Sequence, residues 1–384
     1  MKQKIKTTLT ILSMLVLFGC DYETLVINTV HEDGSVTRTV TMKNSEEDFN
    51  PEKYRVPVDS TWQTEITTEI NENGDTSWIL TAEKYFASVD EINEEYENDQ
   101  GSNKLLERTA HFSRSFKWFT TVFRYSETVE KVVSVNCPVE SFLSDEELKF
   151  FYLPGKVQNE LKEGADSLTY RDLSDTIDAK TEVWLWTGFV RQWIEIFYGI
   201  TEGHPELTIS KEEMHSKEPE IVQVIIDFEE SEEEEEEEIL NGMEGDEELI
   251  QDVEEEMEKE ESPDDIQIII ESVFSKTFYS TFKTEIDSSM SEIETMTDPY
   301  WSAESYDLEI RMPGKILSSN GYADTEPESN GEGGILWTVQ GDYFLLQQYE
   351  MWVESKISNI WAWIVTGVFV LFVITGLMVR RRKG

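Results

Sequence analysis

The chain has 384 residues, of which 80 are Asp or Glu and 32 are Lys or Arg, so its formal net charge at pH 7 is −48. The phosphates of nucleic acid and of anionic lipid headgroups would meet like charge, which excludes nucleic acid as a partner and makes anionic headgroups poor partners. About 335 residues lie between two apolar ends, enough for one large or two ordinary domains.

The chain begins with a segment typical of a secretion signal. Three lysines fall within the first six residues, and the apolar stretch at residues 9–18 is half of the roughly 20 residues that cross a bilayer. The "LFGC" that follows resembles the lipobox of bacterial lipoproteins, in which the Cys is acylated and becomes the first residue. We therefore expect residues 1–19 to be a signal peptide and Cys20 to be a lipid anchor that carries palmitate. Ordinary secretion with an unmodified Cys is the alternative.

Residues 20–136 are predicted to form a β-rich extracytoplasmic part. Asp33-Gly34 between two β-rich runs is a strong hairpin signal, of the turn type that needs positive φ at both central residues. Alternation of apolar and polar residues over 62–70, ahead of Asn73-Gly74, predicts a half-buried strand and a second hairpin.

The remainder of this part contains one helix signal and two further strand signals. Ser88 and Glu91 form a capping box that opens a short helix. Residues 112–122 are expected to form one long strand and residues 129–135 another.

Residues 137–226 change to a helical period and form a predicted helical middle. Ser144 and Glu147 form another capping box, and an amphipathic helix is expected from about residue 176 to 200. Its apolar face is unusually broad. Such a face is most often simply core; the alternative is a pocket for an apolar ligand or contact with the membrane surface. The residues of this candidate apolar-ligand face are Trp184, Trp186, Phe189, Trp193 and Phe197.

Cys137 is the second of only two cysteines. Once Cys20 is acylated, Cys137 has no partner within the chain for a disulfide. We expect its side chain to be buried, with pairing between chains as the alternative.

Residues 227–265 form an acidic low-complexity segment with 23 Asp or Glu residues against one Lys. Such a segment repels itself and buries too little apolar area to offset the entropy lost on ordering. We expect a solvated linker; capture of a basic partner is the alternative. A helix signal follows at Ser262-Pro263-Asp264-Asp265, where a cap, a first-turn proline and two acids lie together.

Residues 266–356 are expected to contain that helix and then the C-terminal strands. Because strands are followed by helices and then by strands again, the predicted fold class is α+β. We expect the N- and C-terminal strands to combine in one antiparallel sheet around the inserted helical middle. The last strand leads almost directly into an apolar run.

The C-terminal end carries a predicted transmembrane helix at residues 357–379 and a basic tail at residues 380–384. Residues 360–379 have no formal charge and match the thickness of a bilayer. The positive-inside rule places the basic cluster in the cytoplasm and the main domain outside. Asp21, directly after Cys20, resembles the inner-membrane retention signal of bacterial lipoproteins, so both anchors are expected in the cytoplasmic membrane. The topology residues are Arg380, Arg381, Arg382 and Lys383.

Several of these features together resemble one known family. A lipobox Cys, an early strand-"DGS"-strand hairpin, a late "PGKILSSNG…ILWTV" segment and a final span followed by arginines look like the LppM-type envelope lipoproteins. The resemblance covers the two ends of the chain, about 80 residues, and not the helical middle or the acidic tract. It implies an extracytoplasmic, lipid-associated domain on a C-terminal membrane tether and supplies no site residues.

No catalytic motif is found in the sequence. The four histidines do not fall into a metal-binding spacing, although His204, Glu206, Glu213 and His215 could surround a metal by chance in so acidic a chain. We therefore expect no enzymatic activity, no metal and no cofactor. The leading hypothesis is a membrane-tethered protein that binds a lipid or other apolar ligand. The alternative is an envelope scaffold whose acidic tract contacts basic protein surfaces.

Overall fold

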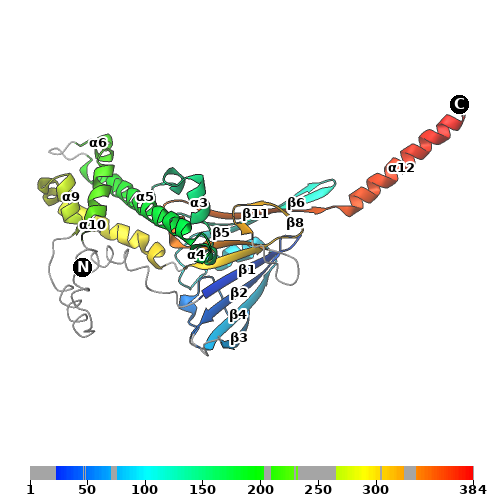
Figure 1. Ribbon diagram of the computed structural model, residues 1–384, viewed down its shortest axis with the longest axis horizontal. Helices are drawn as coiled ribbons and strands as arrows, with labels where there is room; N and C mark the ends of the chain where they lie inside the picture. Colours follow the sequence, from blue (N-terminus) through cyan, green and yellow to red (C-terminus); the bar gives the residue numbers. More distant parts are fainter. Residues whose placement is uncertain are drawn as a thin grey trace. The chain divides into compact units, whose positions relative to one another are not determined.

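A computed structural model describes residues 23–45, 47, 49–70, 76–202, 209–228, 231, 265–302, 305–323 and 334–383. The chain divides into two compact units. The helical unit comprises residues 132–148 and 169–298, and the sheet unit comprises residues 21–131, 149–168 and 299–384, in each case over the described positions. Helices and mixed sheets are both present, so the predicted α+β class is confirmed (Figure 1).

The larger sheet of the sheet unit has seven strands in the order β3-β4-β2-β1-β7-β10-β9. All neighbouring pairs are antiparallel except β1 and β7, which are parallel. Its strands are β1 (Glu23–Val30), β2 (Val36–Asn44), β3 (Gln63–Ile70), β4 (Thr76–Phe86), β7 (Tyr306–Arg311), β9 (Tyr322–Ala323) and β10 (Ile335–Val339).

The smaller sheet has four antiparallel strands in the order β5-β6-β11-β8. They are β5 (Arg108–Lys117), β6 (Thr120–Val129), β8 (Lys315–Ser319) and β11 (Tyr349–Ser358). Each sheet thus combines strands from the two ends of the chain, which confirms the sharing predicted from sequence. The strands form two sheets rather than one, because β5 and β6 pair with β11 instead of joining β4.

The first hairpin forms where it is predicted, but with a longer turn. Gly34 has φ +94°, and no described residue other than glycine has positive φ, so Asp33 does not adopt the turn type predicted for the pair. The Asp33 carboxylate instead accepts hydrogen bonds from the backbone N–H and the hydroxyl of Ser35. The loop from His31 to Ser35 is closed by a hydrogen bond from the His31 N–H to the Ser35 carbonyl, 2.9 Å.

The predicted half burial of the strand at residues 62–70 is wrong for β3. Every residue of β3 is exposed, including Ile66 and Ile70, and Trp62 just before it is buried. β3 is the outermost strand of the seven-stranded sheet, so alternating residues do not guarantee that either face is covered. The predicted turn at Asn73-Gly74 lies outside the described residues.

The predicted long strand at residues 112–122 is a hairpin. β5 and β6 pair closely, with Lys117 opposite Thr120, so the chain reverses at Trp118 and Phe119. The strand predicted at residues 129–135 is also wrong, because β6 ends at Val129. Two large aromatic residues carry none of the usual turn signals, which explains why the sequence suggested continuity.

The amphipathic helix predicted at about residues 176–200 is part of a longer helix, α5 (Ser167–Thr201). The capping box predicted ahead of α3 (Asp145–Phe151) is present, because the Ser144 N–H donates to Glu147 and the Glu147 N–H to the Ser144 hydroxyl. The other helices are α2 (Val89–Glu97), α4 (Gly155–Glu163), α6 (Lys211–His215), α9 (Asp265–Val273), α10 (Lys276–Ser302), α11 (Gly341–Phe344) and the 3₁₀ turns Pro51–Lys53 and Val139–Ser141.

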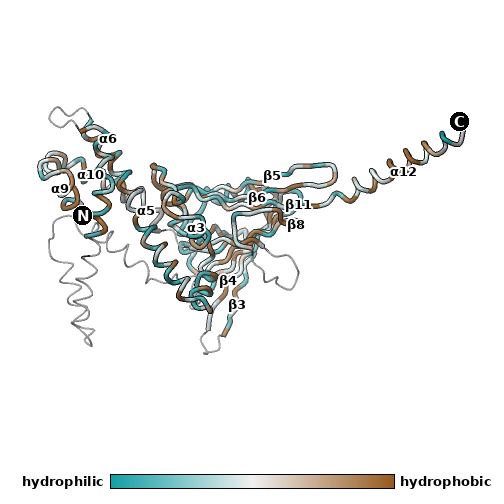
Figure 2. Tube along the Cα trace, turned by 45° about the horizontal axis from the view of Figure 1, so that its top comes forward, coloured by the Kyte–Doolittle hydropathy of each residue, from teal (hydrophilic) through white to brown (hydrophobic). Residues whose placement is uncertain are grey.

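α12 (Ile360–Lys383) follows β11 with one residue between them. Among the described helices it is the one long and apolar enough to cross a membrane, over Ile360–Met378. Most of this helix is hydrophobic and its C-terminal end is hydrophilic (Figure 2). The predicted passage from the last strand directly into an apolar helix is therefore confirmed.

Candidate functional site

The candidate apolar-ligand face of α5 is buried in the helical unit. All five of its aromatic residues are at most 6% exposed. The Trp186 ring lies 5.9 Å from that of Phe189 and 6.3 Å from that of Trp193, and Phe197 touches the rings of Phe274 and Phe278. Trp186, Phe189 and Trp193 therefore form an aromatic cluster within α5, and Phe197 contacts α10 and Phe274 just before it.

One residue of this face, Trp184, contacts the segment around Cys137. The Trp184 indole N–H donates to the Cys137 carbonyl at 2.7 Å, and Arg191 donates to the Cys137 sulfur at 3.2 Å. Cys137 is buried, as expected, and burial raises the pKa of its thiol above the usual value. Burial therefore favours the protonated thiol of this cysteine at neutral pH.

Trp193 differs from the other tryptophans of the α5 face in the hydrogen bonding of its indole nitrogen. Its indole N–H is buried and has no hydrogen-bond partner among the described residues. Leaving such a donor unsatisfied costs about 1–3 kcal/mol. The aromatic cluster therefore contains one buried hydrogen-bond donor that no described residue satisfies.

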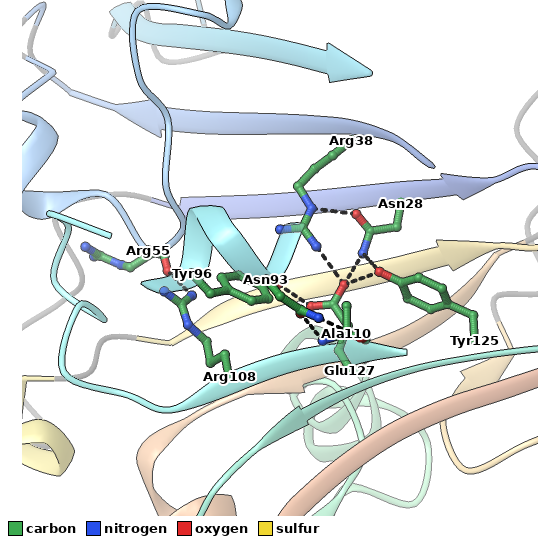
Figure 3. A network of polar contacts seen from close by, with 9 residues as sticks. All are labelled: Asn28, Arg38, Arg55, Asn93, Tyr96, Arg108, Ala110, Tyr125 and Glu127. Carbon is green, nitrogen blue, oxygen red and sulfur yellow. Dashed lines mark hydrogen bonds and ion pairs between the residues drawn. The ribbon is translucent and has the colours of Figure 1, made fainter. Parts of the chain in front are cut away.

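The second feature is a buried polar network between the two sheets of the sheet unit, around the carboxylate of Glu127 on β6 (Figure 3). Its Oε1 accepts from Arg38 at 2.7 Å, from the Tyr125 hydroxyl at 2.7 Å and from the Asn28 amide. Its Oε2 accepts from the Tyr96 hydroxyl on α2. The Arg38 guanidinium also donates to Asn28, 2.8 Å.

Neighbouring groups extend the network away from Glu127. Arg108 forms a buried ion pair with Asp99, donates to the Arg55 carbonyl and lies over the Tyr96 ring, 4.4 Å from its centroid. Asn93 of α2 exchanges two hydrogen bonds with the backbone of Ala110 on the edge strand β5.

The polar network joins parts of the sheet unit that are distant in the sequence. Arg38 is paired with Glu127 and Arg108 with Asp99, and Glu127 and Arg38 are 3% and 1% exposed. Burial raises the pKa of Tyr96 and of Tyr125 well above 10, so both phenols stay protonated and donate. The network holds β1 and β2 of one sheet, β6 of the other and α2 in one arrangement.

The histidines do not gather around a metal in the described part of the chain. His31 contacts Thr37, His111 lies on β5, and His215 contacts Glu195 of α5. No group of three or more potential ligands is found within the described residues. Of the four residues that could surround a metal by chance, His204 and Glu206 lie outside the described residues.

A third feature is the junction between β11 and α12, where Asn359 is the single connecting residue. Its amide nitrogen donates to the carbonyls of Lys117 (3.0 Å) and Trp118 (3.3 Å), and its amide oxygen accepts from Thr121 (3.0 Å). Its backbone N–H donates to the Phe119 carbonyl. Asn359 is buried and ties the β5–β6 hairpin to the start of the apolar helix.

The sequence-predicted anchor residues fall at the margins of the structure. Cys20 and Asp21 lie outside the described residues, and Arg380 to Lys383 form the last turn of α12. The sequence analysis missed Asn359, Arg38 and Glu127. A polar residue at an otherwise apolar alternating position of β2 is the one local signal for Arg38.

Comparison with models of known protein families, with curated proteins and with solved structures finds no match for this chain. The resemblance to LppM-type envelope lipoproteins therefore stays a prediction.

Proposed function

We propose that the protein is a non-catalytic lipoprotein of the bacterial cytoplasmic membrane that binds a lipid or another apolar ligand in its helical unit. The observation that carries this is the aromatic cluster on α5, which contains a buried indole donor at Trp193 without a partner in the described structure. An ester or amide carbonyl of a lipid would accept that hydrogen bond while its chain packs on the rings.

The proposed location follows from the two ends of the chain. α12 spans the membrane, its basic end lies in the cytoplasm and both units lie on the extracytoplasmic side. Cys20 carries the acyl chains and Asp21 keeps the protein in the cytoplasmic membrane. Acyl chains on one end bind a protein to the membrane only weakly, whereas a spanning helix holds it permanently. The acyl chains on Cys20 therefore serve to position the N-terminus.

The test is native mass spectrometry of the full chain extracted from its own membrane, followed by lipid analysis of what co-purifies. We expect one class of lipid to be retained in stoichiometric amount, beyond the chains on Cys20. A protein that carries no such lipid would contradict the proposal.

A matched pair of tryptophan variants locates the ligand. Trp193→Phe removes the donor without a partner and should reduce lipid retention about tenfold, since one hydrogen bond to a buried group is worth about 1–1.5 kcal/mol. Trp184→Phe removes an indole that donates to the Cys137 carbonyl. It should lower the unfolding temperature and leave the retained lipid per folded protein unchanged.

The scaffold alternative depends on the acidic tract. Replacing residues 229–261 by a Gly/Ser chain of the same length removes the charge and keeps the connection. Lipid retention should survive this replacement if the ligand binds at α5, whereas crosslinking to basic envelope proteins should be lost if the tract recruits them.

A further inference from the structure

The tip of the β5–β6 hairpin lies beside the first turns of α12. Trp118 meets Trp361 edge to face with centroids 5.4 Å apart, and Phe119 meets Trp363 at 4.2 Å. The Trp118 indole N–H donates to the Thr366 hydroxyl at 3.0 Å. Thr366 is six residues into the helix, about 9 Å along its axis. If α12 crosses the membrane, the hairpin tip lies at the depth where the membrane begins.

The tip exposes aromatic surface at this level. Phe116 is 55% exposed and Trp118 48% exposed, and the Phe116 ring stacks on Trp361, which is itself 51% exposed. This surface is continuous with the apolar surface of α12. Aromatic rings with one polar atom are the side chains that concentrate at the membrane interface.

The charge of this end is opposite to that of the chain. The three segments that build it, residues 108–126, 310–323 and 355–383, contain no Asp or Glu, although 80 of the 384 residues are acidic. Four exposed cations lie near the junction instead. They are Arg114 and Lys117 on β5, Lys315 on β8 and Lys356 on β11.

The position of two of these cations points to an external anion. Lys315 and Lys356 are directly opposite each other on neighbouring strands, an arrangement of like charges that destabilises a sheet. Lys356 is three residues from Asn359, which places it about 10 Å from the start of α12. The headgroup layer of a bilayer extends about 5–8 Å beyond the hydrocarbon on each side, so the lysines reach its phosphates.

We propose that the hairpin tip, residues 115–119, is inserted in the extracytoplasmic interface of the membrane and that Arg114, Lys117, Lys315 and Lys356 bind the phosphates of anionic phospholipids there. This rests on the membrane tether of the proposed function. The tip, Asn359 and α12 then form one membrane-contacting body that sets the orientation of the four-stranded sheet.

Insertion is tested on the full chain in nanodiscs of phosphatidylcholine and phosphatidylglycerol. A nitroxide on Ser115→Cys should be accessible to oxygen and protected from a soluble nickel chelate. The same label on Thr64→Cys of the exposed strand β3 should be accessible to the chelate. A label on Val368→Cys inside α12 reports whether the helix spans the bilayer.

The three labels separate the two proposals. A protected label at 368 with a chelate-accessible label at 115 would overturn the inserted tip and leave the tether standing. Chelate access at 368 would overturn the tether itself, and the inference with it.

Phosphate binding is tested by native mass spectrometry of the full chain released from the mixed nanodiscs. The wild type should retain phosphatidylglycerol in preference to phosphatidylcholine. Because each interfacial cation favours an anionic surface by roughly fivefold, Lys315→Gln/Lys356→Gln should lower this preference at least about fivefold. Lys43→Gln, whose lysine pairs with Glu69 on the other sheet, should not change it. An unchanged preference in the double variant would overturn the cationic site.

Discussion

Glu127 shows how one residue can decide the packing of a whole unit. Its carboxylate accepts from residues of two sheets and a helix, and no water-exposed position would give it that set of donors. A buried charge of this kind is tolerated because Arg38 neutralises it and the remaining lone pairs are satisfied. The buried pair of Glu127 and Arg38 therefore contributes more to fixing how the two sheets and α2 pack together than to the net free energy of unfolding.

Removing only one charge of this pair should be costly. Glu127→Gln leaves the Arg38 guanidinium buried without a counter-charge and should lower the free energy of unfolding by about 3–5 kcal/mol. The measurement is urea unfolding of the full chain in detergent, followed by circular dichroism.

The double variant Arg38→Met/Glu127→Gln removes both charges and keeps an acceptor for Asn28 and the tyrosines. It should be more stable than Glu127→Gln alone, because no bare charge remains in the core. The single variant Arg38→Met completes the comparison. If the losses of stability in Arg38→Met and Glu127→Gln simply add in the double variant, the pair is not coupled and this account of the network fails.

At the scale of elements, the start of α3 combines a local signal with a distant one. The capping box of Ser144 and Glu147 can be found in the sequence, but Lys180 of α5 also donates to the Glu147 carboxylate, 2.6 Å. The hydrogen bond from Lys180 has the largest effect on the pKa of Glu147, followed by those from Ser144. Together they lower this pKa to about 2.

The pKa of Glu147 predicts a pH dependence of stability. A carboxyl with a depressed pKa in the folded state stabilises the fold above its unfolded pKa of about 4.3, and this contribution is lost as the pH falls to about 2. As the pH falls from 5 to 2, the Glu147→Gln variant should therefore lose less stability than the wild type, because it has no carboxylate to protonate at this position.

The measurement is the unfolding temperature of the full chain across that range. Glu140→Gln, at an exposed carboxylate of the same unit, is the control and should follow the wild type. Parallel pH profiles for Glu147→Gln and the wild type would show that the contact with Lys180 is not formed in solution.

Element prediction succeeded where the signal is local and failed where it depends on neighbours. The first hairpin, α5 and the final helix follow from turn residues and periodicity. The exposure of β3 depends on what covers the sheet, and the reversal at Trp118 and Phe119 is stabilised by Asn359 and by the start of α12.

At the scale of the whole molecule, the sheet unit separates its two predicted anchors. β1 runs parallel to β7, and β7 leads to Pro313 and Gly314, which pack on the end of β11 next to α12. Glu23 therefore lies at the end of β1 away from α12, about 23 Å along the strand from Val30. Three residues from Cys20 to Glu23 reach at most about 11 Å. Both anchors enter one membrane only if the sheet unit lies along its surface.

This geometry predicts an effect of the lipid on orientation. A fluorophore on Glu23→Cys should transfer energy efficiently to labelled lipid headgroups when Cys20 is acylated, and less efficiently in the Cys20→Ser variant. A fluorophore on Ser358→Cys, beside α12, should give the same transfer in both. Equal transfer from position 23 with and without the lipid would contradict two anchors in one membrane.

The sequence by itself determined the features that depend on neighbours along the chain. The apolar span, the first hairpin, the long aromatic helix and the α+β class all follow from composition and periodicity over short windows. The aromatic residues of the α5 face, and core packing as the usual role of such a face, were also identified in this way, although the missing partner of Trp193 was not.

Only the tertiary structure decided which distant segments meet. The pairing of β1 with β7, the ion pair of Arg38 with Glu127 and the contact of Trp118 with Thr366 join residues about 90 to 280 positions apart. The same holds for charge: the net −48 disfavours anionic lipid, yet three acid-free segments meet at the start of α12. Local patterns cannot show this, because the sign of a surface patch depends on which chain segments the fold brings together.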